Sequence, residues 1–292
     1  MTGDGNLINQ GTIIADGSNG DPQRTIDVDI FDNEGIIQIA NGAILNLLGN
    51  WSNEEGDITI DSNSSLVISD SFNTLRLGNI DNSRGGNVSI QNYSWDNSNS
   101  SYTFNNSTGP WTFNGGTITG GTLIAEEGNF IVGTGNNVLD GVSVDGNLNL
   151  NTLDNARLTL TNGSTFIGNA NLGDGAILNI ATNQTINNSV IDLGGPGARF
   201  EVSGDNNVIL GAGSQLILGN SDTSISSDVT VNGNDNFINQ GTIIADSSNG
   251  NPNRSIDVAV FDNQGIIQVA NGSILNILVQ LSKNNPPVTY DL

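Results

Sequence analysis

The sequence predicts an all-β protein, a right-handed parallel β-helix (β-solenoid) in which the chain winds into a stack of short-stranded coils. Three observations predict it: brief apolar–polar alternation, a high density of Asn and Gly, and a long internal repeat. Helix-forming residues are scarce, with a single Met and a single Lys, so a helical protein is excluded. We expect the right hand because parallel crossover connections prefer it.

Short strands are indicated by apolar–polar–apolar triplets. Alternation over three to five residues is typical of a strand with one buried face. Equivalent strands recur about every 20–24 residues, so we expect Ile13, Ile37 and Thr59 to stack, and likewise Leu45 and Val67. Further triplets are Ile58-Thr59-Ile60, Val142-Ser143-Val144, Leu148-Asn149-Leu150 and Leu158-Thr159-Leu160.

The turns between strands are marked by pairs of Asn, Asp and Gly. Asn and Gly tolerate left-handed backbone angles, so these pairs are strong turn formers. The pairs include Asn41-Gly42, Asp140-Gly141, Asp145-Gly146 and Asn162-Gly163.

Many short strands with regular turns fit either an antiparallel sandwich or a parallel β-helix. A sandwich of this size needs longer alternating strands, and the turns here are too dense for it. A solenoid fits both features, with two or three short strands in each coil. At roughly 22 residues per coil the chain predicts about 13 coils. Inward Ile, Leu and Val form columns, and Asn side chains at turns form hydrogen-bonded ladders.

A long repeat defines the domain organisation. Residues 6–48 (NLINQGTII…) and 236–278 (NFINQGTII…) align without a gap, and thirty-two of their forty-three positions are identical. We therefore assign residues 1–281 to the β-helix, made of one unit of about 230 residues (6–235) and the start of a second copy (236–278). Residues 282–292 contain Pro286 and Pro287 and form a linker or an extended polar tail.

Composition excludes several classes of protein. The 30 acidic and 7 basic residues give a formal charge of -23, which argues against binding to nucleic acid or to anionic membrane surfaces. No apolar run reaches membrane-spanning length. The chain has no Cys and no His, so thiolate and imidazole metal sites, catalytic triads and Cys–His dyads are excluded.

Residues 112–130, 137–150 and 156–180, with their GGT and LDGV motifs, resemble the long repeats of giant bacterial surface proteins. So do the NQGTI motifs of both repeat copies. These are filamentous-haemagglutinin-like and autotransporter-passenger-like proteins, and the resemblance covers most of residues 6–280. It implies a parallel β-helix in an extracellular or cell-surface rod, often an adhesin or matrix component. It implies no catalytic residue.

Two segments are similar to the nonapeptide that binds Ca²⁺ in toxin-type β-rolls. Residues 133–141 and 204–210 have comparable spacing, but Asn137 and Asn207 replace the ligating Asp, and the motif is not repeated in tandem. Losing that charge weakens a site for a hard cation. The acidic run from Asp16 to Asp21 is not kept in the second copy, which favours turn chemistry. We expect no cofactor and no specific metal site, with only weak, non-specific Ca²⁺ binding to the acidic surface.

Some parallel β-helices are polysaccharide lyases or hydrolases. The predicted fold therefore makes an enzyme more plausible, but by analogy only. Charges that recur at the same place in both repeats more often close a loop by a salt bridge than perform catalysis. We therefore expect no enzymatic activity and assign no catalytic residue. The best charged set is Arg24, Asp27 and Asp32, which recurs as Arg254, Asp257 and Asp262.

Aromatic residues concentrate in and around residues 92–109. Exposed Tyr and Trp rings stack on sugars, so Tyr93, Trp95 and Trp111 are candidate carbohydrate-binding residues. The alternative is that these rings fill the core. We favour the core for Phe104 and Phe113, because they alternate with polar residues like the other triplets.

The main functional prediction is a structural or adhesive segment of a large, repetitive, secreted or cell-surface bacterial protein. Its partners would be further copies of itself or neighbouring repeat modules, and head-to-tail stacking into filaments follows from the similar coils of the two copies. The alternative is a carbohydrate-binding module that recognises surface glycans, or less favourably a polysaccharide lyase or hydrolase.

Overall fold

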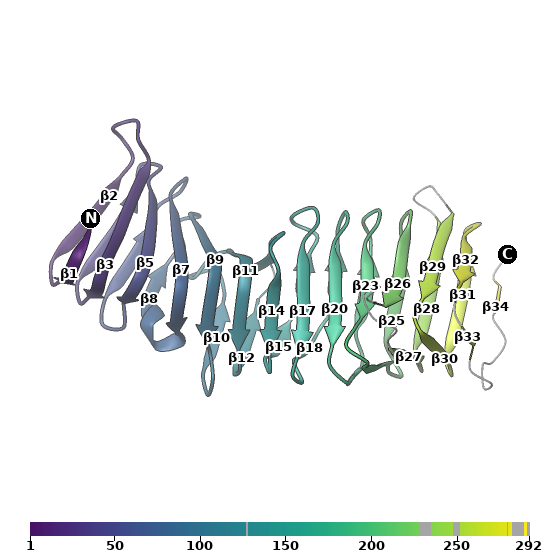
Figure 1. Ribbon diagram of the computed structural model, residues 1–292. Coiled ribbons are helices and arrows are strands. Elements are labelled where there is room, and N and C mark those ends of the chain that lie inside the picture. Colours follow the sequence, from purple (N-terminus) through teal and green to yellow (C-terminus); the bar gives the residue numbers. More distant parts are fainter. Residues whose placement is uncertain (127, 228–234, 248–251, 279, 282–288, 291–292) are drawn as a thin grey trace. The chain divides into compact units, whose positions relative to one another are not determined.

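The computed structural model describes residues 1–126, 128–227, 235–247, 252–278, 280–281 and 289–290 (Figure 1). It is all-β, with 61% strand and about 2% helix. Parallel strands stack as a β-solenoid of about 12 turns, which confirms the predicted fold class with about one coil fewer than expected. The handedness stays a prediction. The chain divides into two compact units, Met1–Ile131 and Val132–Leu292.

Unit 1 builds its coils from long strands that alternate with short ones. Its first ladder pairs β1, β3, β5, β7, β9 and β11 in parallel, and a second pairs β2, β4, β6 and β8. β10 pairs with β12. The elements are β1 (Thr2–Asn9), β2 (Thr12–Asp16), β3 (Gln23–Asn33), β4 (Ile36–Ala40), β5 (Ile44–Ser52), β6 (Asp57–Ile60), β7 (Ser65–Asn73), the 3₁₀ helix η1 (Thr74–Leu77), β8 (Asn79–Asp81), β9 (Asn87–Asp96), β10 (Ser101–Phe104), β11 (Trp111–Thr119) and β12 (Thr122–Ala125). β13 (Phe130–Val132) spans the boundary between the units in the sequence.

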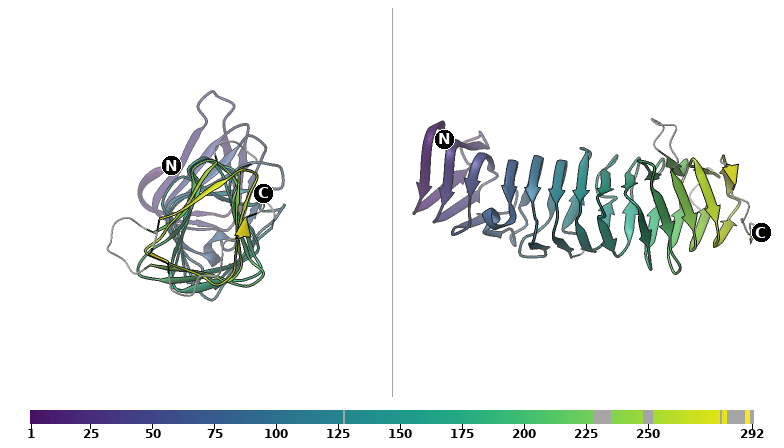
Figure 2. Two further views of the ribbon diagram at one scale, coloured as in Figure 1. Left: turned by 90° about the vertical axis from the view of Figure 1, so that its right-hand side faces the viewer. Right: turned by 60° about the horizontal axis from the view of Figure 1, so that its bottom comes forward.

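Unit 2 has three strands in each coil, and the coils trace a three-sided outline when they are viewed end-on (Figure 2). The elements are β14 (Asn137–Asp140), β15 (Ser143–Gly146), β16 (Leu148–Leu150), β17 (Arg157–Thr161), β18 (Thr165–Ile167), β19 (Ala170–Leu172), β20 (Ile177–Ala181), β21 (Gln184–Ile186), β22 (Val190–Leu193), β23 (Arg199–Val202), β24 (Asn207–Leu210), β25 (Gln215–Leu218), β26 (Thr223–Ser227), β27 (Asn236–Asn239), β28 (Thr242–Asp246), β29 (Asn253–Asp257), β30 (Val260–Asn263), β31 (Ile266–Ala270), β32 (Ile274–Ile277), β33 (Gln280–Leu281) and β34 (Thr289–Tyr290).

The strands of unit 2 pair with the equivalent strands one coil away. One ladder runs β14–β17–β20–β23–β26–β29–β32 and another runs β16–β19–β22–β25–β28–β31–β34. The third side carries β15–β18 and β21–β24–β27–β30–β33. Every coil therefore satisfies the backbone of its neighbours, which is how a parallel sheet can be built from such short strands.

The interior consists of columns of apolar side chains, as the alternation predicts. In unit 2, Leu158, Leu178 and Phe200 are in register on three successive coils, and each is at most 1% exposed. Each such residue contributes about 1.5–3 kcal/mol of hydrophobic stabilisation when it is fully buried. Because each column continues through the next coil, the stability of each unit grows coil by coil.

The predicted stacking is correct for the first pair of coils and wrong by one residue for the next. Ile13 pairs with Ile37, but Ile37 then pairs with Ile58 and not with Thr59. Likewise Leu45 pairs with Leu66, so Val67 faces outward. The coils vary in length, and a one-residue shift exchanges the inward and outward faces of a strand.

A buried ladder of amides runs through one corner of unit 1. Asn9 Nδ2 donates to Asn33 Oδ1 at 2.6 Å, and Asn33 Nδ2 donates to Asn53 Oδ1 at 2.5 Å. The ladder ends on the carbonyl of Leu77, which accepts from Asn53 Nδ2 at 2.9 Å. This confirms the predicted stacking of Asn at turns.

The two predicted Asn-Gly turns adopt the conformation expected of them, whereas Asp145 and Gly146, predicted as a turn, lie in the strand β15. Asn41 and Gly42 have φ values of 55° and 76°, and Asn162 and Gly163 have 48° and 80°. Two consecutive positive φ angles define a type I′ turn, for which Asn-Gly is the preferred pair.

The two copies of the repeat fold alike. Thr12 pairs with Ile36 in the first copy, and Thr242 pairs with Ile266 in the second, at the same offset within the repeat. The Asn ladder recurs as well, because Asn239 Nδ2 donates to Asn263 Oδ1 at 2.7 Å. The repeated sequence therefore specifies the same pair of coils in both units.

The predicted linker or tail, residues 282–292, lies mostly outside the described residues. Its one described segment, β34, pairs in parallel with β31 through Thr289 and Tyr290. Within the described part of the chain, no helix has the length and apolar character needed to cross a membrane.

Candidate functional site

The three candidate carbohydrate-binding residues lie in the core. Trp95 and Trp111 are 0% exposed and Tyr93 is 4% exposed. Their rings therefore present no face on which a sugar could stack, and the prediction of an exposed aromatic strip is wrong. The core alternative is confirmed for these residues, and Phe104 and Phe113 are buried as expected.

Packing inside unit 1 explains the burial. The Trp95 ring lies 6.2 Å from the Phe113 ring in a stacked arrangement and 5.3 Å from Tyr102 edge-on. The polar edge of each indole is satisfied internally: Trp95 Nε1 donates to Thr74 Oγ1, and Trp111 Nε1 donates to the Thr108 carbonyl, both at 3.0 Å. Burial also raises the pKa of the Tyr93 hydroxyl well above its ordinary value.

The residues that replaced calcium ligands connect coils instead. Asn137 is 2% exposed, and its Nδ2 donates to the Arg157 carbonyl of the next coil at 3.1 Å as well as to the Gly133 carbonyl of its own loop at 3.1 Å. Asn207 Oδ1 accepts from Asn236 Nδ2 one coil later at 3.1 Å. Among the described residues, no group of three or more acidic side chains is arranged to hold a metal ion.

The acidic run from Asp16 to Asp21 serves turn geometry. Asp16 Oδ1 accepts from the amide of Ser18 at 2.7 Å, and Asp21 Oδ1 accepts from the amide of Gln23 at 3.0 Å. The hydrogen bonds from Ser18 lower the pKa of the Asp16 carboxyl below its ordinary value. Turn chemistry therefore accounts for both carboxylates.

Arg24 closes a loop through backbone oxygens rather than through the predicted salt bridge. Arg24 donates to the carbonyls of Asp21 at 2.8 Å and Gln23 at 2.7 Å, and also to that of Asp16. Arg254 makes the equivalent bond to the Asp246 carbonyl. Arg24 thus reaches backbone oxygens that converge on it, rather than the carboxylates of Asp27 or Asp32, and the three charged residues do not form a site.

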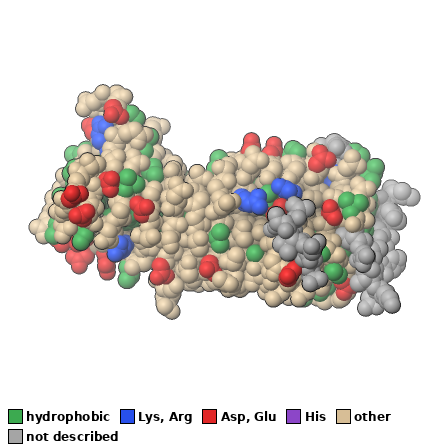
Figure 3. Space-filling model, in the orientation of Figure 1, with side chains coloured by type: hydrophobic (Ala, Val, Ile, Leu, Met, Phe, Trp, Pro, Cys, Tyr) green, Lys and Arg blue, Asp and Glu red, His purple; other side chains and the backbone are tan. Residues whose placement is uncertain are grey.

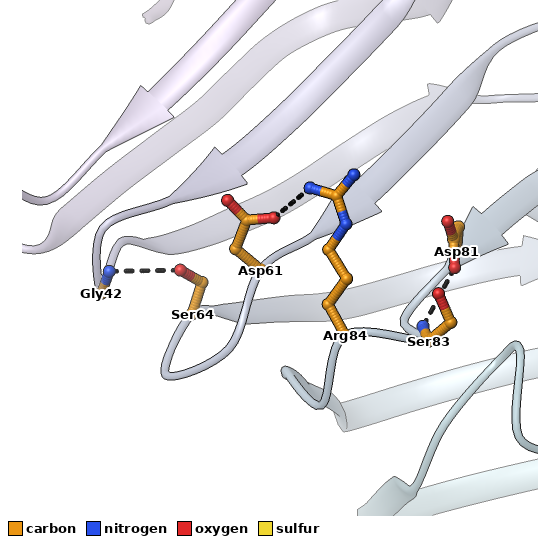
Figure 4. Close-up of polar contacts among 6 residues, drawn as sticks. All are labelled: Gly42, Asp61, Ser64, Asp81, Ser83 and Arg84. Atoms are coloured by element: carbon orange, nitrogen blue, oxygen red, sulfur yellow. Dashed lines mark hydrogen bonds and ion pairs between the residues drawn. The ribbon is translucent and has the colours of Figure 1, made fainter.

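An open polar hollow of about 510 Å³ lies on unit 1, and Figure 4 shows three of its lining residues, Gly42, Asp61 and Arg84. Three successive turns line it, through Asn41 and Gly42, Asp61 to Asn63, and Arg84. Arg84 donates to Asp61 Oδ1 at 2.6 Å, and this hydrogen bond raises the pKa of the guanidinium. Sequence patterns did not single out this pair, because its members come from neighbouring coils.

The lining residues of the hollow supply one carboxylate, from Asp61, and one guanidinium, from Arg84, and these two groups are paired with each other. The lining offers no second carboxylate for the paired-carboxylate mechanism of glycoside hydrolysis.

A second charged group lies on the outer face of unit 2. Glu201 contacts Arg157 Nη2 through Oε2 and Arg199 Nη1 through Oε1, both at 3.5 Å. Sequence analysis missed this group because the two arginines are two coils apart. The regular coil period could have revealed it, since Arg157 and Arg199 both pair with Ile177. Elsewhere on the face seen in Figure 3, acidic side chains are scattered and form no continuous stripe.

Comparison of the chain with models of known protein families, with curated proteins and with solved structures gives no match.

Proposed function

We propose that the protein is a structural segment of a large repetitive bacterial surface or secreted protein, in which a β-solenoid acts as a stiff spacer that presents neighbouring modules. The observation that carries the proposal is the continuous parallel ladder that runs from coil to coil along at least one side of each unit, with the interior filled by apolar columns. Coils that satisfy one another's backbone resist bending, because every bend strains a ladder of hydrogen bonds.

The distribution of polar groups supports the same function. Several of the described charged residues serve turns and loops: Asp16 and Asp21 hold turns, and Arg24 closes a loop. A surface of amides and scattered carboxylates stays hydrated without a dedicated ligand site. The extracellular location rests on the resemblance to bacterial surface repeats, and we propose no enzymatic activity.

The spacer function is tested by the stiffness of the chain in solution. Small-angle X-ray scattering should give the profile of a rod whose cross-section matches one coil, and inserting one additional coil into unit 2 should lengthen the particle by about 4.8 Å without widening it. A compact or flexible profile would contradict the proposal. For the location, antibody labelling of intact cells of the source organism should detect the protein without permeabilisation.

Head-to-tail assembly is a second element of the proposal. Residues 6–48 and 236–278 form coils with identical strand registers, so a coil that packs on one copy finds the same arrangement on the other. Such heterologous contacts extend into filaments when they do not close. Light scattering should therefore show particles that grow with protein concentration, whereas a concentration-independent monomer would refute assembly.

A further inference from the structure

Two of the six arginines differ from the rest in the hydrogen bonds that their guanidinium groups make. Arg24, Arg76, Arg84 and Arg254 all donate hydrogen bonds to oxygens of the protein. Within the described residues, the side chains of Arg157 and Arg199 donate none, and they approach only Glu201 at 3.5 Å. A charge-assisted hydrogen bond is about 2.7–2.9 Å long, so these contacts are loose.

The strand register fixes the two arginines on one surface. Arg157 on β17 and Arg199 on β23 flank Ile177 on β20, which places their backbones roughly 10 Å apart. Ile177 points outward, yet it is only 5% exposed. Both side chains converge on Glu201, so the guanidinium groups come closer together than their backbones.

Each of the two guanidinium groups is partly exposed and has N–H donors that Glu201 does not contact. The side chains of Arg157 and Arg199 are 38% and 46% exposed, whereas that of Glu201 is 10% exposed. A guanidinium offers five N–H donors in a planar fork that matches a carboxylate. Glu201 engages one nitrogen of each arginine, so most of these donors face solvent, and the three side chains together carry one net positive charge.

The surroundings favour a hydroxyl-rich ligand. Asn179 pairs with Glu201 across the β20–β23 ladder, and Ser224 pairs with Arg199 across β23–β26. Both are outward-facing and half-buried, as is Thr159 on β17. These groups offer hydroxyls and an amide beside the two guanidinium groups on a face built of parallel strands, which suits an extended polymer.

We propose that Arg157 and Arg199 form a binding site for the carboxylate groups of an acidic polysaccharide, one built from uronic acid units. Glu201 lies 3.5 Å from a nitrogen of each guanidinium group, so the two arginines are close enough for one carboxylate to approach both. The site goes beyond the spacer function, because a stiff spacer does not need it, and a failure of either proposal leaves the other intact.

The net charge of -23 opposes the binding of any polyanion, so the proposal makes a prediction that the overall charge does not. A protein this acidic should repel polyanions unless a local site binds them. At physiological ionic strength the Debye length is about 8 Å, so distant carboxylates are screened and the two arginines act locally. Binding should weaken as salt is added, because it depends on charge.

The test is isothermal titration calorimetry of the full chain with oligogalacturonate, and with its methyl ester as an uncharged control. We expect saturable binding of the acid and none of the ester. Arg157→Gln and Arg199→Gln should each weaken binding at least about tenfold, as expected for loss of a charge-assisted pair. Glu201→Gln removes the competing carboxylate and should tighten binding several-fold.

Arg84→Gln is the matched control, because it removes one exposed, ion-paired arginine from another surface with the same change in net charge. It should bind oligogalacturonate as the unmodified chain does. The proposal is refuted if the acid does not bind, if the ester binds equally well, or if Arg84→Gln weakens binding as much as Arg157→Gln. Circular dichroism of each variant, with its melting temperature, separates lost binding from lost folding.

Discussion

At the scale of single residues, the repeat depends on a glycine where two coils approach closely. A Cβ placed on Gly35 would lie 2.3 Å from the carbonyl oxygen of Gly11, and one on Gly265 would lie 2.3 Å from that of Gly241. Both glycines follow the ladder asparagine by two positions, so the NxG pattern serves two purposes. The Asn connects the coils, and the Gly lets their backbones come together.

Replacing Gly35 with Ala should therefore destabilise the protein. We expect Gly35→Ala to cost about 1–3 kcal/mol, the usual penalty for forcing extra volume into a packed site. Gly11→Ala is the matched control, because a Cβ there would have nothing within 4 Å. Urea unfolding measures both, and equal stability of the two variants would contradict the close approach.

The buried amide ladder gives a second prediction at this scale. Asn33→Asp keeps the shape of the side chain but removes the Nδ2 donor that reaches Asn53 Oδ1 and the Gly35 carbonyl. Because the site is 0% exposed, the new carboxylate faces acceptors without water, and we expect a loss of at least about 2 kcal/mol at neutral pH.

The control for this change is Asn19→Asp in the exposed loop between β2 and β3, which adds the same charge at the surface. Thermal unfolding should be nearly unchanged for Asn19→Asp. Lowering the pH should partly restore Asn33→Asp, because a protonated carboxyl regains a donor. If the Asn33→Asp variant is as stable as the parent protein at neutral pH, the ladder is not needed for stability.

At the scale of the elements, aromatic side chains fill the core of unit 1 where β9, β10 and β11 meet. Trp95 contacts Trp111, Phe104 and Phe113 with ring centroids 6.2–6.3 Å apart. Aromatic pairs of this kind add about 0.5–1.5 kcal/mol each beyond the area they bury. Ring packing therefore adds to the backbone ladders that hold the coils of this region together. Unit 2 has a smaller aromatic column, Phe200, Phe237 and Phe261, beside its aliphatic ones.

Alkaline titration should reveal this burial. Loss of hydration raises the pKa of both Tyr93 and Tyr102 above the ordinary value of 10.0. The raised value favours the neutral phenol in the folded state, so its contribution to stability is complete below pH 10 and is lost progressively as the pH rises above it. Near-ultraviolet absorbance should show two of the three tyrosines ionising only on unfolding.

The control for that experiment is the chain in concentrated denaturant, where all three tyrosines should titrate together. Tyr102→Phe should remove one late-titrating group and leave the other. Normal titration of all three in the folded protein would place these rings at the surface and reopen the question of an aromatic binding strip.

At the scale of the whole molecule, the dominant property is an excess of negative charge that nothing in the described structure gathers into one site. The ion pairs among the described residues include Arg84–Asp61, Arg157–Glu201 and Arg199–Glu201. Mutual repulsion of so many carboxylates destabilises the folded state and is weakened by salt.

Divalent cations should accordingly act without selectivity. We expect Ca²⁺ and Mg²⁺ to raise the melting temperature by similar amounts, each more than NaCl at the same ionic strength, and without saturating at one ion per chain. Differential scanning fluorimetry across a concentration series measures this. A saturable response to Ca²⁺ alone would indicate a specific site and contradict the expectation.

The fold class, the two Asn-Gly turns and the equivalence of the two repeat copies could be predicted from the sequence alone. Alternation, Asn-Gly pairs and the repeat are local signals, and local backbone preference acts on them directly. The Asn ladder could also be anticipated, because stacking equivalent turns brings equivalent side chains together.

Only the tertiary structure decided which alternating residues face inward and which groups meet across coils. Coil lengths vary, and one added residue reverses the two faces of a strand, so Ile58 rather than Thr59 continues the column of Ile37. For the same reason Trp95 lies inside. Arg157 and Arg199 approach Glu201 because the strand registers of two successive coil pairs align them. A local sequence pattern contains no information about these registers.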